Sequence, residues 1–208
     1  MISAASTKVF KGTTVSKGIA RGPIYFKKEL NLTNGWAVRG SVTDEQNRYN
    51  KAVDLSRTDL NQLIASMDVS HSEGRDVIEA HIQLLEDPEV QDQVFAKIEN
   101  GFSAIEAYST IVEDFRNLFA QLDDEYMKQR VHDLDDVSKR VLFYIANPNE
   151  TYENISLTQP SILVSDDLSP SQLLGLDKSK VLGVVLKHGS TQSHTSILMI
   201  ASQKLLAS

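Results

Sequence analysis

Cysteine is absent from the 208 residues, which excludes a disulfide framework and any metal site built on thiolates. Long apolar runs are also absent, and none approaches the ~18 residues that a membrane-spanning helix needs. The first twelve residues contain no apolar core of the signal-peptide type. From these absences we expect a cytoplasmic protein.

Positive charge is in deficit, with 21 Lys and Arg against 28 Asp and Glu and a net charge of −7. This balance disfavours nucleic acid and anionic membranes as partners. The acidic residues are concentrated in one short stretch, where they form either a solvated helix face or part of a functional surface. They are Asp123, Asp124, Glu125, Asp133, Asp135 and Asp136.

The middle of the chain has the apolar period of α-helices. Thr43 and Gln46 predict a capping box at the first helix start, Ser103 and Glu106 predict another, and Asp87-Pro88 predicts a helix restart. Five helical segments result, at about 43–67, 73–86, 88–100, 103–122 and 134–146. With two of them broken at Asp87-Pro88, they are expected to pack as a four-helix bundle.

The two ends of the chain have β-character instead. Strands are expected among the first 40 residues and at 161–165 and 181–186, and Ser169 is expected to cap a short helix. Neither end is large enough for a core alone. We therefore predict an α/β domain made of residues 1–40 and 150–208, with residues 1–8 as a linker or tail, interrupted by a helical domain at residues 41–149.

The stretch around His194 carries the chemistry. A buried strand leads through a small-residue turn into a helix that begins at about His194. A helix N-terminus presents unpaired N–H groups to an anion and disfavours imidazolium by ~0.3–1 kcal/mol. The ring is therefore expected to stay neutral and nucleophilic, and the hydroxyls of Ser193, Thr195 and Ser196 would solvate a phosphoryl group on it.

Other interpretations of this stretch stay open. Ser193 fits an ordinary N-cap beside a surface histidine, and His188 in the same turn is nearly as good a candidate nucleophile. A metal site at His188 and His194 is disfavoured because the turn lacks carboxylates. We expect neither a metal nor a cofactor.

Six ordered motifs resemble the N-terminal phosphohistidine domain of Enzyme I, the first protein of the bacterial phosphoenolpyruvate:sugar phosphotransferase system. The similarity covers nearly the whole chain. The motifs are SKGIARG at 16–22, EAHIQLLED at 79–87, LDDEY at 122–126, DLDDV at 133–137, DLSPS at 167–171 and SHTSIL at 193–198. The resemblance implies an α/β phosphohistidine domain interrupted by a helical domain.

The resemblance also implies roles for individual residues. His194 would carry the phosphoryl group, and Ser169 would hydrogen-bond its ring. The helical domain would dock the histidine phosphocarrier protein through His81, Leu84, Asp87, Glu89 and Val90, an apolar patch with an acidic rim. Without the family, His81 fits a core histidine on the inner face of its helix.

The chain departs from the Enzyme I pattern in the turn before His194 and just after it. Ser190 and Gln192 replace a glycine and a threonine, and Met199 and Ile200 stand where the family has Ala-Arg. Only 14 residues follow His194, so the next strand is expected to be missing or vestigial, and the phosphoenolpyruvate-binding barrel is not in this sequence.

These departures are more similar to the Enzyme I-like last domain of phosphotransfer subunits of phosphotransferase-dependent dihydroxyacetone kinases. In that interpretation the partners are a phosphocarrier-like domain and the other kinase subunits. The alternatives are a fragment of Enzyme I and a docking module that binds the phosphocarrier without being phosphorylated.

Overall fold

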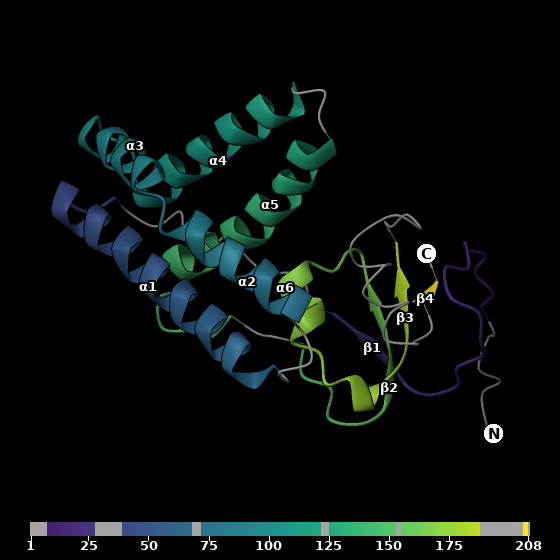
Figure 1. Ribbon diagram of the computed structural model, residues 1–208. Coiled ribbons are helices and arrows are strands. Elements are labelled where there is room, and N and C mark those ends of the chain that lie inside the picture. The colour runs from purple at the N-terminus through teal and green to yellow at the C-terminus, as the bar shows by residue number, and fades with distance from the viewer. Residues whose placement is uncertain are drawn as a thin grey trace. The chain divides into compact units, whose positions relative to one another are not determined.

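The computed structural model describes residues 8–27, 39–67, 72–121, 125–152, 155–187 and 206–207. The chain divides into a helical unit, residues 29–155 with 169–176, and a sheet unit, residues 1–28, 156–168 and 177–208. The fold is mostly helical with a small sheet (Figure 1). In chain order the elements are β1 (Ile24–Phe26), α1 (Val42–Ser66), α2 (Ser72–Leu85), α3 (Pro88–Glu99), α4 (Ala104–Ala120), α5 (Glu125–Ala146), β2 (Ser161–Ser165), α6 (Pro170–Leu174), the 3₁₀ turn η2 (Lys178–Lys180), β3 (Val181–Leu186) and β4 (Leu206–Ala207).

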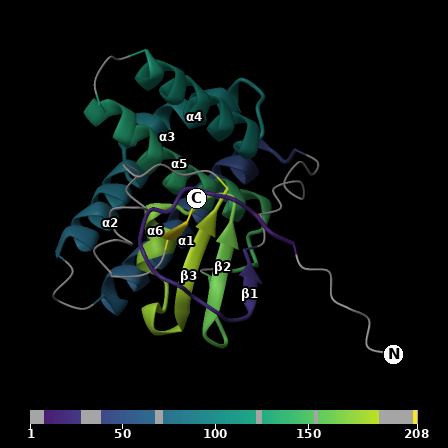
Figure 2. The same cartoon turned by 90° about the vertical axis from the view of Figure 1, so that its right-hand side faces the viewer.

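The sheet unit is built on parallel strands in the order β1-β2-β3-β4, and Figure 2 shows β1, β2 and β3 side by side. In the register, Tyr25 pairs with Leu163, and Leu163 with Val184. Leu163 and Val184 are buried, whereas Phe26 and Val185, in the next row of the sheet, are exposed. The predicted strands at 161–165 and 181–186 are confirmed, and one face of the sheet carries most of its burial.

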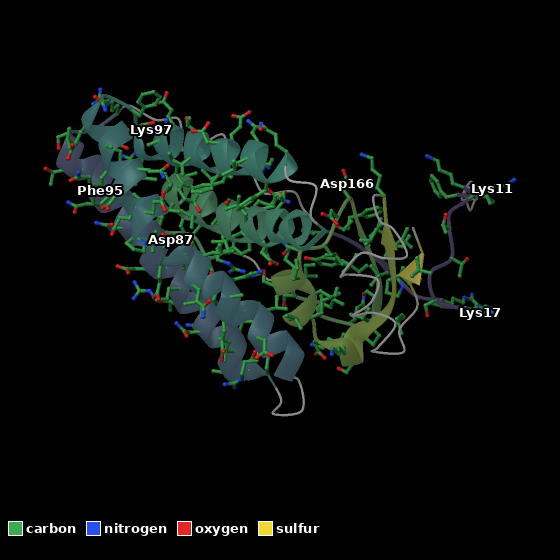
Figure 3. The ribbon with its side chains drawn as sticks, turned by 45° about the horizontal axis from the view of Figure 1, so that its top comes forward. Lys11, Lys17, Asp87, Phe95, Lys97 and Asp166 are labelled. Atoms are coloured by element: carbon green, nitrogen blue, oxygen red, sulfur yellow. The ribbon has the colours of Figure 1, made fainter. Side chains whose placement is uncertain are left out.

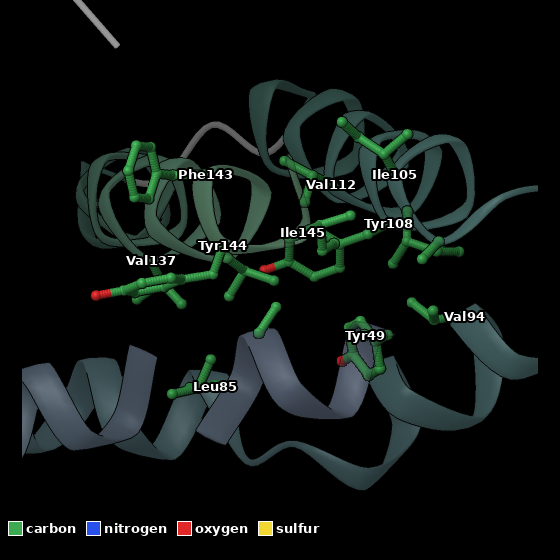
Figure 4. Packing of buried hydrophobic residues seen from close by; sticks show 14 of the residues in the cluster. Tyr49, Leu85, Val94, Ile105, Tyr108, Val112, Val137, Phe143, Tyr144 and Ile145 are labelled. Atoms are coloured by element: carbon green, nitrogen blue, oxygen red, sulfur yellow. The ribbon is translucent and has the colours of Figure 1, made fainter. Parts of the chain in front are cut away.

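The helical unit has its own apolar core. α1 packs against α2 and α5, and α4 packs against α3 and α5. In this core the ring centroids of Tyr49 and Tyr108 lie 5.7 Å apart, with Val94 beside them (Figure 4). The buried apolar side chains of α1, α3, α4 and α5 recur at helical spacing. The apolar period of the sequence therefore marks the helix faces that are buried in the core.

Helix starts follow local capping chemistry, with one correction to a predicted cap, and α5 begins at Glu125 rather than at about residue 134. Ser103 with Glu106 forms the predicted capping box of α4, and Asp87 caps α3 with Pro88 in its first turn. The predicted box at Thr43 and Gln46 is wrong, since α1 is capped by Ser41 with Asp44. Ser41 is the N-cap because its backbone N–H and its hydroxyl both donate to the Asp44 carboxylate, at 3.0 and 2.7 Å.

Glu45 joins the starts of two helices from a fully buried position. Its Oε1 accepts from the Gly40 N–H at 2.8 Å, and its Oε2 accepts from the Ala104 N–H at 2.7 Å. A buried carboxylate is tolerated when hydrogen bonds replace its hydration. Glu45 thereby ties the first turn of α4 to α1.

Candidate functional site

The predicted phosphoryl acceptor lies outside the described residues. This applies to His194, its neighbours Ser193 and Thr195, and the competing His188. Of the predicted catalytic group, Ser169 is the member that the structure describes.

Ser169 is the N-cap of α6, as predicted. Its Oγ accepts from the Gln172 N–H at 3.4 Å, and its own N–H donates to Gln172 Oε1 at 3.2 Å. Pro170 follows at the first helical position, where its missing N–H costs nothing. Ser169 is half-buried. Because the cap uses a lone pair of the hydroxyl, the hydroxyl hydrogen remains for another acceptor.

Ser171 fixes this short helix to α5. Its N–H donates to Asp136 Oδ2 at 2.9 Å, and its hydroxyl donates to Asp136 Oδ1 at 2.8 Å. Both residues are buried, at 0% and 2% exposure. A carboxylate that accepts two hydrogen bonds from one residue fixes both the position and the orientation of that residue. The Ser171 Oγ also lies 3.4 Å from the Ser169 Oγ.

Arg140 extends the network toward α1. Its Nη2 donates to Ser171 Oγ at 3.1 Å, and its Nη1 donates to Asp59 Oδ2 at 3.0 Å. The guanidinium is buried and stacks on the Tyr152 ring, with Cζ 4.2 Å from the ring centroid. A buried guanidinium needs both a counter-charge and filled donors, which Asp59 and Ser171 supply.

Tyr144 and Tyr152 also contact this network. The Tyr144 hydroxyl donates to Asp59 Oδ2 at 2.6 Å and accepts from the Tyr152 N–H at 3.1 Å. Burial, reinforced by the hydrogen bond to Asp59, raises the pKa of Tyr144 to about 12. Burial likewise raises the pKa of Tyr152 to about 12, against the opposing effect of Arg140. Both rings therefore stay protonated near neutral pH.

Four residues of this network are not among those expected from the sequence: Asp59, Ser171, Arg140 and Tyr144. A local signal was present, because Asp136, Arg140 and Tyr144 recur at a spacing of four, beside the apolar positions Val137 and Val141 of the same helix. Charged residues at inward helical positions indicate a buried pair rather than a solvated face. Their side-chain partners Ser171 and Asp59 lie 31 to 85 residues away, so the spacing does not identify them.

His81 is enclosed in the helical unit. Its ring is fully buried, with Nε2 at 3.2 Å from Asp133 Oδ1. Its Nδ1 lies 3.7 Å from Asp136 Oδ2, which is beyond hydrogen-bond reach. Asp133 and Asp136, two members of the acidic stretch, thus face inward toward this ring. The predicted docking role of His81 stays a prediction.

The other predicted docking residues lie where α2 ends and α3 begins. Leu84 and Val90 are half-buried, and Glu89 is exposed. Asp87, labelled in Figure 3, caps α3 by accepting from the Glu89 N–H at 2.9 Å. An accessible apolar pair and two carboxylates are therefore close in the chain here, and their role in docking also stays a prediction.

Neither a metal-binding cluster nor a membrane-spanning helix is found in the described ranges of the chain. Among those residues, no group of three or more His, Asp or Glu side chains is placed to hold a metal ion. None of the described helices combines the length and apolar character needed to cross a bilayer.

Two family models match the chain. The model described as "PEP-utilising enzyme, N-terminal" matches residues 11–130, which is more than half of the chain. The chain belongs to the PEP-utilising enzyme family. A second model, "PEP-utilising enzyme, mobile domain", matches residues 157–204. Ser169 and His194 both fall within that second segment.

Curated relatives of this family cover most of the chain. It is 32% identical over 202 residues to a phosphoenolpyruvate-protein phosphotransferase from Staphylococcus aureus (strain MRSA252), which covers 92% of this chain and 34% of the relative. It is also 32% identical over 157 residues to the "PEP-dependent dihydroxyacetone kinase, phosphoryl donor subunit DhaM" of Providencia stuartii (strain MRSN 2154), which covers 74% and 32%. The chain therefore spans about a third of the length of these relatives.

Solved structures show the same fold. A solution structure of Enzyme I matches with a TM-score of 0.77 and 25% identity, over 95% of this chain and 81% of that one. The N-terminal domain of Enzyme 1 - Nitrogen matches with a TM-score of 0.61 and 23% identity, over 94% and 81%. The predicted resemblance to the Enzyme I N-terminal domain is thereby confirmed.

Proposed function

We propose that this chain is a phosphoryl carrier domain that forms phosphohistidine on His194 and exchanges the phosphoryl group with the histidine phosphocarrier protein or a phosphocarrier-like domain. The observation that carries the proposal is the family match over residues 157–204, which contains His194, together with relatives that are named phosphotransferases.

The chemistry needs little beyond alignment. A lone pair of the neutral His194 imidazole forms a new P–N bond while the donor's P–N bond breaks and its electron pair returns to the donor ring. The Ser169 hydroxyl would hold the ring, and Ser193 and Thr195 would donate to the phosphoryl oxygens. Two imidazoles held in line across one phosphorus provide most of the rate by proximity.

The two predicted domains would divide this work. Residues 41–149 would form the docking domain, a four-helix-bundle-like insert, and residues 1–40 with 150–208 would form the phosphohistidine domain. Docking would use Leu84 and Val90 as apolar contacts, with Asp87 and Glu89 as the acidic rim and His81 behind them. The exposure of Glu89 and the partial exposure of Leu84 and Val90 support this surface.

For the parent protein we favour the phosphotransfer subunit of a phosphotransferase-dependent dihydroxyacetone kinase over a fragment of Enzyme I. The relative named as a phosphoryl donor subunit and the departures at Met199 and Ile200 support this choice. The other kinase subunits would then receive the phosphoryl group downstream. Adding those subunits and dihydroxyacetone to the phosphorylated chain tests it, because an Enzyme I fragment would form no dihydroxyacetone phosphate.

Labelling tests the carrier proposal directly. The purified chain is mixed with ³²P-labelled phosphocarrier, and in a second tube with phosphoenolpyruvate and Mg²⁺ alone. We expect an acid-labile, base-stable label from the phosphocarrier and none from phosphoenolpyruvate, since the residues around His194 lack the arginines and carboxylates that such a pocket uses. Binding of the phosphocarrier without labelling would instead establish the docking module.

A further inference from the structure

One face of the sheet is apolar and exposed. On β1 the side chains of Ile24 and Phe26 are 58% and 68% exposed, and Val185 on β3 is 40% exposed. The register places Phe26, Val164 and Val185 in one row, and Ile24 pairs with Ile162 two residues before it. Ile162 and Val164 are half-buried. These five side chains form a surface that we call the open face.

The strand order explains why this face is open. The strands are parallel, and their spatial order β1-β2-β3-β4 is also their order along the chain. Connections between parallel strands are right-handed in about 98% of cases. A sheet whose order reverses receives such connections over both faces, as in doubly wound folds. The order here does not reverse, so right-handed connections have a single face to use. Leu163 and Val184 are buried on the face opposite the open one.

Two charged side chains stand at the border of the open face. The Lys187 backbone N–H donates to the Ser165 carbonyl at 3.0 Å, which extends the ladder between β2 and β3 past the strand ends. Asp166 and Lys187 therefore follow Val164 and Val185 on the same side of the alternation. The Lys187 Nζ donates to Asp166 Oδ2 at 3.1 Å, and both side chains are more than half exposed. An apolar patch bordered by charge is typical of a protein interaction site.

A second copy of this chain is the occupant that these features favour. The open face consists of isoleucine, phenylalanine and valine, without a charged or hydrogen-bonding side chain that would select a partner of one charge. Interfaces between identical subunits are more apolar than those between transient partners. The border carries both signs of charge. Across a two-fold axis, Lys187 of each copy can therefore face Asp166 of the other.

We propose that two copies of the chain pair through their open faces, with Lys187 and Asp166 exchanging partners across the two-fold axis. Two sheets that pack face to face lie about 10 Å apart, close enough for their side chains to interdigitate. Five side chains on each copy are far fewer than the about 20–30 residues per side of a standard interface. The dimer is therefore weak, with a dissociation constant on the order of 10–100 µM. The pairing does not depend on phosphorylation of His194.

Sedimentation velocity on the full chain tests the pairing. The sedimentation coefficient should rise from the monomer value to the dimer value between about 2 µM and 500 µM protein. Phe26→Lys should raise the dissociation constant at least tenfold, because the interface would have to bury an unpaired ammonium group. Leu118→Lys on α4 is the matched control, since Leu118 is 53% exposed in the helical unit, and it should leave the constant within twofold.

The border charges supply a second test, in which affinity is first lost and then restored. Lys187→Asp places like charges opposite each other across the axis and should weaken the dimer several-fold. Asp166→Lys added to Lys187→Asp restores opposite charges in both copies. The double variant should return the dissociation constant to within twofold of wild type.

The outcomes are distinct. A chain that stays monomeric at about 500 µM overturns the proposal. A dimer that Phe26→Lys leaves intact, or that Leu118→Lys weakens equally, places the interface elsewhere and overturns it too. Ile24→Lys replaces Phe26→Lys if circular dichroism shows that the latter is unfolded. If the charge exchange does not restore affinity, the two-fold arrangement is wrong.

Discussion

The helical unit and the sheet unit differ in how each is stabilised. The helical unit has a continuous apolar core and a buried ionic network with partners on α1, α5 and α6. The described strands of the sheet unit bury Leu163 and Val184 on one face while Phe26 and Val185 stay exposed on the other. Among the described residues, the large apolar core and the buried ionic network therefore lie in the unit proposed to dock a partner, whereas the proposed nucleophile His194 belongs to the smaller unit.

The sharpest way to test that division is to remove the proposed nucleophile. His194→Ala should abolish labelling, a loss of at least a thousandfold, while the dissociation constant for the phosphocarrier stays within twofold. Labelling is measured with ³²P-phosphocarrier, and binding is measured by calorimetry. His188→Ala is the matched control and should label normally. Retained label in His194→Ala with loss in His188→Ala would move the acceptor to His188.

Breaking the buried network should destabilise the helical unit most. Arg140→Ala removes a buried guanidinium and leaves the half-buried Asp59 without its counter-charge, which should cost about 3 kcal/mol in the free energy of unfolding. Arg116 forms an exposed ion pair with Asp135, so Arg116→Ala should cost under about 1 kcal/mol. Urea denaturation followed by circular dichroism measures both, and equal effects of the two variants would contradict the distinction between buried and exposed pairs.

Charge reversal at the rim should slow docking and leave the fold intact. Glu89→Lys should lower the association rate constant several-fold at low salt, because rim charges mainly steer encounter. The effect should shrink as ionic strength rises. Stopped-flow mixing measures the rate, with Glu113→Lys on α4 as a control of equal charge change. A chemical-shift map confined to the sheet unit would place docking elsewhere.

Acidification should produce the smallest effect. Hydrogen bonds from Ser41 hold the pKa of Asp44 below the ordinary value of an aspartate, and the hydrogen bond from the Ser103 backbone N–H holds the pKa of Glu106 below the ordinary value of a glutamate. Their stabilising contributions are present above the unfolded-state pKa values and are lost as pH falls through the folded ones. Both carboxylates are exposed, so the loss between pH 5 and 3 should be slight, and Glu106→Gln should reduce it in melting curves taken across that range.

The sequence predicted local features well because their causes are local. Asp87 with Pro88, Ser103 with Glu106 and the Ser169 cap each depend on residues at most three positions apart. The prediction at Thr43 is wrong because two possible boxes overlap within six residues, and contacts of Ser41 and Glu45 decide between them.

Long-range contacts set the limit of what the sequence could predict. The burial of His81 depends on Asp133, 52 residues away, and the place of α6 depends on Asp136, 35 residues from Ser171. The sequence favours a solvated face or a functional surface for the acidic stretch. In the structure, Asp133 and Asp136 face the buried ring of His81. Periodicity finds which positions face inward, but not which distant side chain meets them.

The membership of α6 in the helical unit has a consequence for anyone who dissects this protein. A polypeptide cut to residues 29–155 would contain the five long helices α1 to α5. It would lack Ser171, whose hydroxyl donates to Asp136 and accepts from Arg140. Its interior would then hold a carboxylate and a guanidinium with unfilled hydrogen-bonding positions. Grafting residues 169–176 back through a short loop should restore folding, so the smallest independent helical fragment is discontinuous in sequence.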